Sequence, residues 1–218
     1  MLNEQGAIAS TLRAIRAGAP DAEIIVCDGG SADASVPTAR PLCNLLIDAP
    51  RGRARQMNTG ASRASGEVPA FVHADTIVPA TFHRDLERAL SDPRVVGGRF
   101  DVRLDDGRFW CRLIGKLISI RSRISRTGTG DQAIFVRRGA FDTLGGFPDL
   151  PICEDLDFTR RLKRAGRVAC LRSTVTTSAR RWLARGIART VFTMWTIRAL
   201  YLAGVSPHRL ARLYADVR

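Results

Sequence analysis

The chain has 218 residues, of which 45% are hydrophobic and 25% charged, and its formal net charge at pH 7 is +13. This composition excludes a largely disordered chain and suffices for one sizeable core, so we expect a single domain over residues 1–218. The charge favours an anionic partner. All but two of the 34 lysines and arginines, Lys116 and Lys163, are arginines, which suits phosphate or carboxylate groups or an anionic membrane face; arginine-rich codon usage is the alternative explanation.

The cysteine pattern and the apolar segments bear on the compartment. The five cysteines contain no C-x-x-C pair and are odd in number, which indicates a reducing, cytosolic setting and argues against structural zinc. The opening residues "MLNEQG" lack the basic and apolar regions of a signal peptide. The longest apolar tract, 191–205, carries Arg198 near its centre and is too short for a membrane span. We expect a cytoplasmic protein, attached at most to the inner face of a membrane.

Helix and strand patterns alternate in the first half of the chain. Residues 3–18 have the apolar spacing of an amphipathic helix, with Asn3 as its expected N-cap and Gly18 as its end. Strands are predicted over 22–28, 44–48 and 68–75. Further helices are predicted to begin at about residue 33 and to span 51–66 and 79–92. This alternation predicts an α/β fold with a mainly parallel central sheet flanked by helices.

The second half begins with a strand predicted over 95–104 and a basic amphipathic helix over 109–125, with Leu113, Leu117 and Ile124 expected to face inward. A glycine-rich turn, a strand over 133–137, a short helix, a helix over 154–166, a strand over 167–171 and a helical C-terminal region follow. The chain opens on a helix, whereas a doubly wound sheet begins with a strand. A first strand is thus apparently missing, and we expect a version extended upstream to be more stable or more active.

Asp28 ends a predicted buried strand and is followed by Gly29 and Gly30. Ligands bind at the carboxyl ends of strands in open α/β sheets. A carboxylate there suits the base or ribose of a nucleotide, and the glycines let the backbone approach a ligand closely. The alternative is an Asx turn that closes the loop after the strand. The order D-G-G-S is not the G-x-G-x-x-G of dinucleotide sites.

Three arginines, Arg51, Arg53 and Arg55, lie at the start of the helix predicted over 51–66. A helix N-terminus with guanidinium groups around it attracts anions such as phosphate. Gln56 and Asn58 follow directly. The alternative is a solvated basic helix face, the commoner fate of a run of charges.

His73 and Asp75 end the strand predicted over 68–75, and they lie on the same side because side chains alternate along a strand. Asp75 suits a hard cation such as Mg²⁺ or Mn²⁺, which neutralises the charge of a diphosphate and assists its departure. The alternatives are that Asp75 caps a helix or forms a turn, and that His73 is hydrogen-bonded in the core.

Glu154, Asp155 and Asp157 lie at the start of a predicted helix. Acidic residues at this end stabilise the helix dipole, which is their simplest explanation. Three carboxylates so close together also raise one another's pKa values, which favours one of them as a general base.

These segments occur in the order seen in family 2 glycosyltransferases of the GT-A fold, and the resemblance extends over nearly the whole chain. The strings that carry it are "LNEQGAI", "VCDGGSAD", "RARQMNTGASRASGE", "FVHADT", "TGDQAIFVRR", "LGGF" and "EDLDFTRRLKRAG". The strings "PRGRARQMN", "HADT", "GDQAIFVRR" and "TTSARRW" are similar to those of a small bacterial subgroup, the arsenosugar-biosynthesis-type glycosyltransferases.

The resemblance implies a hexosyltransferase that uses a nucleotide-diphospho-sugar donor and a divalent cation, Mn²⁺ or Mg²⁺. Residues 1–105 would form the nucleotide-binding half, and residues 106–218 the acceptor half with the C-terminal helices. On the donor side it implies nucleotide-sugar contacts from Asp28, Gly29, Arg53, Gln56, Asn58, Asp75 and Arg181, with Asp75 and His73 at the ends of the family's D-x-D metal motif.

On the acceptor side the resemblance implies that Asp155 deprotonates the acceptor hydroxyl in a single inverting displacement, and that Glu154 orients it or touches the acceptor. Acceptor contacts are implied for Gly130, Asp131, Gln132 and Trp182. Two departures from the family pattern matter. His73 replaces a carboxylate, so we expect Asp75 to be the stronger metal ligand. Ser178 replaces the glutamine of a Q-x-x-R-W motif, which argues against a processive polymerase.

The leading hypothesis is therefore an inverting sugar transfer to a small or lipid-linked acceptor. Transfer to a polyprenyl phosphate at the membrane surface is the alternative within the same class, and the basic amphipathic helices with Trp110 and Trp195 either lie on an anionic bilayer or pack against the sheet. A nucleic-acid-binding protein without catalysis is the alternative from another class. Against it, the basic residues are spread along the chain and aromatic residues make up only 6%, few for stacking on bases.

Overall fold

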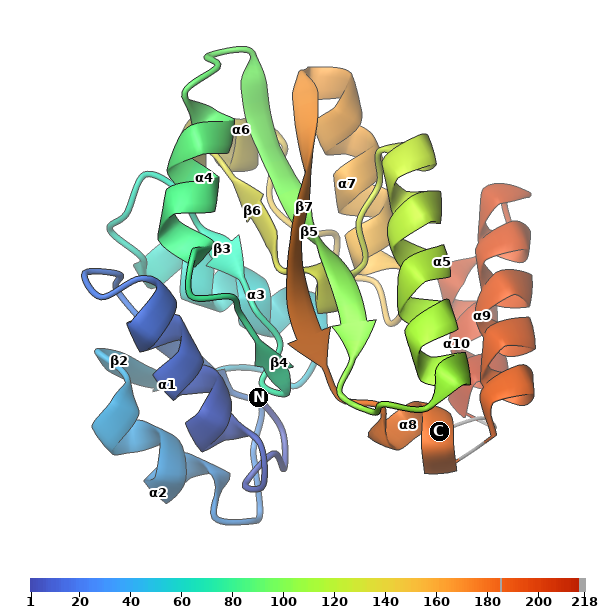
Figure 1. The fold of residues 1–218 in the computed structure, drawn as a ribbon, viewed down its shortest axis with the longest axis horizontal. Helices are drawn as coiled ribbons and strands as arrows, with labels where there is room; N and C mark the ends of the chain where they lie inside the picture. Colours follow the sequence, from blue (N-terminus) through green and yellow to red (C-terminus); the bar gives the residue numbers. More distant parts are fainter. Residues whose placement is uncertain (185, 216–218) are drawn as a thin grey trace.

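The computed structural model describes residues 1–184 and 186–215, except for the side chains at positions 181, 214 and 215. A five-stranded sheet runs through the middle of the molecule (Figure 1). Helices α5, α9 and α10 lie at one side of it, and α1, α2 and a smaller two-stranded sheet lie at the other. The arrangement is an α/β fold, as the alternation of patterns predicts.

The expected elements occur in the expected order, but the strand predicted over 68–75 is wrong in its bounds: it covers only residues 70–71, and a turn that contains Asp75 precedes a further short strand over 76–77. The strands are β1 (Ile25–Asp28), β2 (Leu45–Asp48), β3 (Ala70–Phe71), β4 (Thr76–Ile77), β5 (Val95–Leu104), β6 (Ile134–Val136) and β7 (Arg167–Thr177). The helices are α1 (Ile8–Gly18), α2 (Ser35–Ala39), α3 (Arg53–Arg63), α4 (Phe82–Leu90), α5 (Phe109–Ser125), α6 (Arg138–Thr143), α7 (Glu154–Ala165), α8 (Arg180–Ala184), α9 (Ile187–Leu202) and α10 (Pro207–Ala215), with 3₁₀ turns η1 (Arg40–Leu42) and η2 (Gly130–Gln132).

The strand pairing is more mixed than the mainly parallel sheet that we expect from the sequence. Strands β1 and β2 pair in parallel. The larger sheet has the order β3-β6-β5-β7-β4, in which only β5 and β7 run parallel and the other three pairings are antiparallel. Apolar periodicity identifies a strand but contains no information on its direction or its neighbour, so the alternation of helices and strands overestimates the parallel share.

The start of α1 differs from the expected N-cap at Asn3. The helix begins at Ile8, and Asn3 lies in the left-handed region with φ of 54°. Asparagine tolerates this conformation better than most residues. Its side-chain oxygen accepts a hydrogen bond of 2.9 Å from the N–H of Ala32, and its own N–H donates to the Ser31 hydroxyl at 2.9 Å. Asn3 therefore holds the loop after β1. The predicted end at Gly18 is confirmed.

Two apolar cores cover the two faces of the five-stranded sheet. Phe82 of α4, Phe100 of β5 and Phe135 of β6 form one, with ring centroids 5.0 and 6.0 Å apart. Phe147 and Phe158, 4.3 Å apart, belong to the other. The neighbours of Phe135 along β6 pack into this second core, because successive side chains of a strand point to opposite faces. The sheet is thus held on both sides, and its strand ends are left to form a site.

Helix α5 is turned differently from the sequence-based expectation. Leu117 and Ile124 are 53% and 79% exposed, so the prediction that they face inward is wrong. Its buried face carries small residues instead, among them Gly115 and Ser119. A side chain on Gly115 would come within 2.9 Å of the Val102 carbonyl oxygen of β5. The helix packs with its backbone close to the strand, which only a face of small residues permits, and its large apolar side chains point outward.

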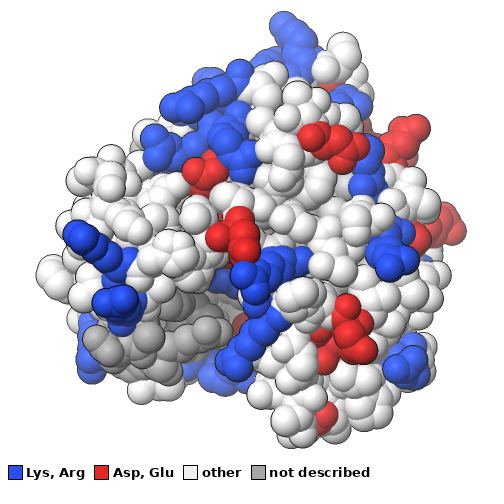
Figure 2. All heavy atoms as spheres, turned by 180° about the vertical axis from the view of Figure 1, so that it is seen from behind, with Lys and Arg blue, Asp and Glu red and all other residues white. Residues whose placement is uncertain are grey.

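Basic side chains are spread over the surface. Viewed from behind, they form separate groups over the face, with fewer acidic side chains between them (Figure 2). Among the residues that the structure describes, none of the helices has both the length and the apolarity that a membrane span requires.

Candidate functional site

The end of β1 forms a tight turn around Asp28. Its two carboxylate oxygens accept hydrogen bonds from the N–H groups of Gly30 (3.0 Å) and Ser31 (2.8 Å) and from the Ser31 hydroxyl (2.6 Å). Burial by itself raises the pKa of Asp28, but these bonds and the Met1 ammonium group outweigh it and hold the pKa below its usual value. The Asx turn, which the sequence leaves open as an alternative, is therefore present.

Gln56 lies directly behind this turn. Its amide nitrogen donates to the carbonyl oxygens of Met1 at 2.8 Å and Cys27 at 3.1 Å. A side chain on Gly29 would come within 2.9 Å of the same nitrogen. Gln56 and Gly29 thus pack against each other, and the amide of Gln56 supports the loop on which Asp28 sits.

Asn58 has a structural role in this arrangement. Its amide nitrogen donates to the Phe147 carbonyl at 2.8 Å, and its amide oxygen accepts from the Phe147 N–H at 2.9 Å. Both polar atoms of the amide are engaged with one backbone position of the "LGGF" turn. This reciprocal pair leaves Asn58 outside the nucleotide contacts that we propose below.

The arginines at the start of α3 do not form the shared cluster that the sequence favours. Arg55 makes an exposed bidentate pair with Asp149, with both shortest distances at 2.9 Å. Arg53 turns toward α7, where its Nε lies 2.7 Å from Glu154. A carboxylate already lies beside each of the guanidinium groups of Arg53 and Arg55, and these two side chains point to different segments. Of the anion site predicted from three neighbouring arginines, only the part around Arg53 is therefore left.

Glu154 is 1% exposed, although it is a carboxylate. Burial raises its pKa to about 7, against the attraction of Arg53 and with a smaller contribution from the negative charge of Asp155. The predicted rise in pKa at this acidic cluster is therefore present at Glu154, but burial is its main cause. Asp157 points elsewhere, bonded to Arg161 at 2.7 Å and to the Tyr201 hydroxyl at 2.9 Å.

Asp155 is held by two backbone groups. Its Oδ2 accepts from the N–H of Gly130 at 2.7 Å, and its Oδ1 from the N–H of Leu156 at 2.6 Å. Gly130 also lies against His73, since any side chain at position 130 would collide with the imidazole ring. The structure thus brings together His73 from the loop after β3, the η2 turn and the start of α7.

The η2 turn contains three of the four residues that the resemblance assigns to acceptor binding. Asp131 is bonded to the Thr129 hydroxyl, and burial raises its pKa, with Asp155 adding to the rise. Gln132 is completely buried, so its side chain lies beneath the site. It donates to the Phe100 carbonyl at 3.1 Å and accepts from the Ser122 hydroxyl at 2.8 Å. Gln132 supports the turn, and direct contact with an acceptor is left to its neighbours.

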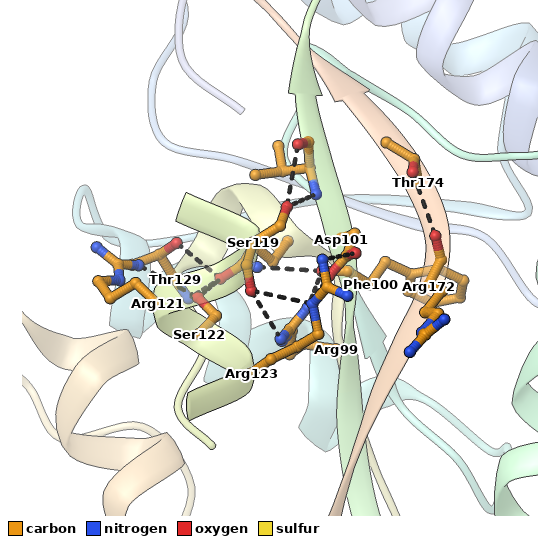
Figure 3. A network of polar contacts seen from close by, with 12 residues as sticks. Arg99, Phe100, Asp101, Ser119, Arg121, Ser122, Arg123, Thr129, Arg172 and Thr174 are labelled. Atoms are coloured by element: carbon orange, nitrogen blue, oxygen red, sulfur yellow. Dashed lines mark hydrogen bonds and ion pairs between the residues drawn. The ribbon is translucent and has the colours of Figure 1, made fainter. Parts of the chain in front are cut away.

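A buried polar network continues from Gln132 into α5 and β5 (Figure 3). Arg99 is 1% exposed and pairs with Asp101 at 2.5 Å; Arg123 of α5 lies 3.0 Å from the other oxygen of that carboxylate. Ser119 bonds both the N–H and the carbonyl of Val102, at 3.0 and 3.2 Å. These contacts fix α5 on β5 and thereby support the η2 turn.

Asp75 lies close to a residue that the sequence reasoning missed, Arg180 at the start of α8. The carboxylate of Glu4 bonds Arg180 at 2.9 and 3.0 Å and raises its pKa, and the charges of Asp75 and Asp105 add to this rise. Arg180 lies within the "SARRW" string, which was the available signal, but the motif resemblance assigned the role to the next residue, Arg181. The N-terminal segment, the loop before β4 and α8 thus meet at Asp75.

A divalent cation at Asp75 would have to be shared with a substrate. In the described part of the chain, no group of three or more His, Cys, Asp or Glu side chains is arranged to hold a metal by itself. Mg²⁺ is commonly held by one or two carboxylates together with substrate phosphates. The single carboxylate of Asp75 agrees with that pattern, whereas the imidazole of His73 is not part of it.

Two of the predicted site residues, Arg181 and Trp182, belong to α8. The side chain of Arg181 lies outside the described residues. Trp182 is half-buried and packs with Leu104, Ile114 and other apolar residues between α5 and α9. Much of its ring is therefore used in packing.

Two further arginines that sequence reasoning did not single out, Arg121 of α5 and Arg198 of α9, lie near Asp155. The charge of Asp155 opposes the lowering of both pKa values that burial causes. Neither belongs to a recognisable motif, and only the packing of α5 and α9 brings them to the site.

The site therefore has two sides. The β1 loop, Arg53 and the loop with Asp75 suit a nucleotide with its phosphates, since they combine close backbone approach with cationic and metal-binding groups. The η2 turn and Asp155 supply an oriented carboxylate on the other side. Such a carboxylate can remove a proton from a hydroxyl group.

Comparison with known proteins agrees with the fold described above. The mannosyltransferase PcManGT from Pyrobaculum calidifontis, solved with GDP-Man and Mn²⁺, superposes with a TM-score of 0.66 at 22% identity, over 91% of this chain and 58% of that one. S. aureus TarS 1-349 gives 0.65 at 18% identity, over 83% and 59%; its complex with UDP-GlcNAc gives 0.65 at 18%, over 82% and 56%.

At these identities the likeness establishes the GT-A-type fold. The chain spans less than two thirds of the length of each of these proteins. No curated protein matches the chain. Residues 1–144 match the family model described as glycosyl transferase family 2. Because this match covers more than half of the chain, the protein belongs to glycosyl transferase family 2.

Proposed function

We propose that the protein transfers a hexosyl group from a nucleotide-diphospho-sugar to a hydroxyl group of its acceptor, with inversion at the sugar. The observation that supports this most is the position of Asp155. Two backbone N–H groups orient its carboxylate, and it lies at the turn against which His73 packs. A fixed carboxylate beside residues suited to a diphosphate is what a single displacement requires.

The transfer needs no reactant besides the donor and the acceptor. The acceptor oxygen forms a bond to the anomeric carbon of the donor, and the bond from that carbon to the diphosphate oxygen breaks. The electron pair leaves with the nucleoside diphosphate, and the acceptor proton passes to Asp155. Glu154 lies behind Asp155 and holds Arg53 at 2.7 Å, so we assign it a positioning role.

On the donor side we propose that Asp28 and Gly29 contact the nucleoside and that Arg53 and Arg181 attract the diphosphate. Gln56 supports the Asp28 loop from behind. Asp75 would hold a divalent cation, with His73 as the lesser partner. When bound, Mn²⁺ or Mg²⁺ supplies positive charge that stabilises the departing diphosphate.

We further propose that residues 1–105 bind the donor and residues 106–218 the acceptor, with Gly130, Asp131 and Trp182 on the acceptor side. The complexes of the similar structures with UDP-GlcNAc and GDP-Man support a sugar nucleotide of this kind. Membership of the arsenosugar-type bacterial subgroup remains a prediction from the short motif strings.

A membrane-bound acceptor, such as a polyprenyl phosphate or another lipid, is the second candidate, and the surface of α5 and α9 favours it. The two helices pack side by side (Figure 1). Their exposed large apolar side chains, each more than half exposed, are Phe109, Trp110, Leu117, Ile124, Phe192, Trp195 and Leu202. Exposed Arg112, Lys116 and Arg189 lie on the same helices. Apolar and cationic groups together match an anionic lipid surface on the cytoplasmic side.

A thermal-shift panel of sugar nucleotides, each with and without Mn²⁺, tests the main proposal. We expect stabilisation by one donor that depends on the metal, because a ligand that binds only the native state raises its melting temperature. If no sugar nucleotide shifts the melting temperature while nucleic acid is retained in a gel at physiological salt, the enzyme assignment is wrong.

A further inference from the structure

Arg121 near the end of α5 and Arg198 in α9 are two half-buried arginines close to the proposed base. Arg198 donates to the Thr127 hydroxyl at 3.1 Å, and Arg121 donates to the Ser122 hydroxyl at 3.3 Å. The Nε of Arg121 is buried and has no hydrogen-bond partner. The Arg121 side chain extends away from the Arg99–Asp101 pair (Figure 3), so it is not part of that network.

In the part of the chain that the structure describes, these two guanidinium groups have no direct counter-charge. Within the described residues, neither of them lies within 4.0 Å of a carboxylate, whereas Arg53, Arg99 and Arg123 each do. Burial lowers the pKa values of both, that of Arg198 to about 10, and the positive charge of Arg121 contributes to the shift at Arg198. Asp155 acts on both from a greater distance. Two mutually repelling cations in a half-buried place are unfavourable unless an anion joins them.

The hydrogen-bonding groups of Arg121 and Arg198 indicate which kind of anion suits them. A guanidinium group carries five N–H donors in a planar fork, and the two side chains use only one protein hydroxyl each. Two such forks match the several oxygens and the double negative charge of a phosphate group. The neighbouring carboxylates, Asp131 and Asp155, would repel this anion, so it is held on the arginine side, and the hydroxyl of the same molecule is left for Asp155.

We propose that Arg121 and Arg198 bind a phosphate group of the acceptor, which also carries the hydroxyl group that it presents to Asp155. The proposal rests on the proposed function, because it takes Asp155 to mark the acceptor side of the site. It adds the substrate class: a hydroxyl-bearing phosphate ester, either a soluble molecule or the headgroup of a lipid.

Binding is tested with glycerol 3-phosphate by calorimetric titration of the full chain, saturated with a nucleoside diphosphate and Mn²⁺ so that the donor side is filled. The variants are Arg121→Gln and Arg198→Gln, with Arg121→Lys and Arg198→Lys as conservative forms. Arg84→Gln and Arg88→Gln are controls, because they are exposed arginines of α4 and belong to neither proposed binding surface. We expect the glutamine variants to bind about tenfold or more weakly, the lysine variants to fall between, and the controls to bind like the original protein.

Equal affinity of the glutamine variants and the original protein for glycerol 3-phosphate would overturn the inference, and so would equal use of glycerol and glycerol 3-phosphate as acceptors. Donor binding is measured on the same samples. If no sugar nucleotide binds, the proposed function fails, whereas the titration without nucleotide still decides whether the two arginines bind phosphate. If a donor binds but the arginine variants take up phosphate unchanged, only the inference fails.

A second pair of acceptors distinguishes a soluble phosphate ester from a lipid headgroup. Neutral phosphatidylcholine vesicles contain either phosphatidylglycerol or diacylglycerol; both of these lipids carry a hydroxyl group, but only the headgroup of phosphatidylglycerol also carries a phosphate ester. Transfer to soluble glycerol 3-phosphate alone identifies a soluble acceptor, and transfer to phosphatidylglycerol alone identifies a lipid headgroup. Transfer to diacylglycerol at the same rate as to phosphatidylglycerol contradicts the proposal.

Discussion

The backbone N–H of Gly130 donates a hydrogen bond of 2.7 Å to Oδ2 of Asp155, 25 residues further along the chain. This contact fixes the carboxylate that we propose as the base. It exists because the η2 turn packs against His73 on one side and is supported from below by the fully buried Gln132. One backbone group thus joins the proposed metal side of the site to the proposed acceptor side.

Gly130→Ala tests this junction. A methyl group at position 130 has no room beside the His73 ring, so the turn must shift and the contact with Asp155 lengthens. We expect stability to fall by about 1–3 kcal/mol, as in other cases of overpacking, and turnover to fall together with it. Gly139→Ala in α6 is the matched control, since nothing lies within 4 Å of a side chain there. Urea unfolding and initial transfer rates measure both. Identical behaviour of the two variants would refute the junction.

Asp155→Asn removes the proposed base but keeps its shape. We expect turnover to fall by about 10²- to 10⁴-fold, the usual contribution of a positioned general base, while the affinity for the sugar nucleotide stays within about twofold, because the change lies on the acceptor side. Asp157→Asn on the same helix is the control, since its side chain contacts Arg161 and Tyr201. The base assignment fails if Asp157→Asn is the more damaging change.

The buried carboxylate of Glu154 predicts a pH dependence of stability. Its pKa is raised to about 7 in the native protein, against about 4.3 in an unfolded chain. Between these values the native state holds a proton that the unfolded chain has lost, so the free energy of unfolding falls as the pH rises through this window. The contribution is fully present below the unfolded pKa and is lost as the pH passes the native pKa.

Glu154→Gln removes this dependence. We expect the stability of the variant relative to the original protein to rise by about 1–3 kcal/mol between about pH 4 and pH 8, measured by urea unfolding at both values. Glu67→Gln, at an exposed position, should leave the pH dependence as it is. A relative stability that falls with pH would show that the native pKa of Glu154 is lowered.

Metal-dependent donor binding shows whether Asp75 or His73 is the stronger metal ligand. We expect Asp75→Ala to abolish the stabilisation by Mn²⁺ and sugar nucleotide, and His73→Ala to weaken donor binding by only about tenfold, because carboxylate oxygen is the better ligand for Mn²⁺ or Mg²⁺. Titration of the donor with and without Mn²⁺ measures the difference. An equal loss in the two variants would contradict the ranking.

The outward-facing apolar side chains of α5 and α9 predict binding to anionic vesicles. We expect the protein to float with vesicles that contain phosphatidylglycerol and not with pure phosphatidylcholine, and Trp195→Ser to weaken the binding about tenfold by loss of buried apolar area. Leu45→Gln, an exposed apolar position on β2, is the control. Flotation that does not depend on lipid charge, or that is unchanged in Trp195→Ser, would exclude this surface as a lipid contact.

Local sequence was sufficient for the order of the elements and for the residues at the strand ends. Asp28 and Asp75 could be singled out as candidates from the sequence alone because an apolar segment followed by polar residues is a pattern within a few adjacent positions. The roles of Gln56, Asn58 and Gln132 could not be found in this way. Their amides bond backbone groups far away in the chain, and a motif does not distinguish an amide that binds a ligand from one that supports a loop.

The sequence by itself determined an α/β chain of glycosyltransferase type, with acidic residues at the start of α7 and a cationic surface, because periodicity, composition and motif order are local properties. Only the tertiary structure decided which way the strands pair, that Glu154 is buried against Arg53 while Asp155 faces the η2 turn, and that α5 packs through its small residues. It also brought Arg121 and Arg198 near Asp155, with no carboxylate of the described residues paired to either. These outcomes depend on burial and on contacts between distant segments, and such contacts form only when the chain is packed.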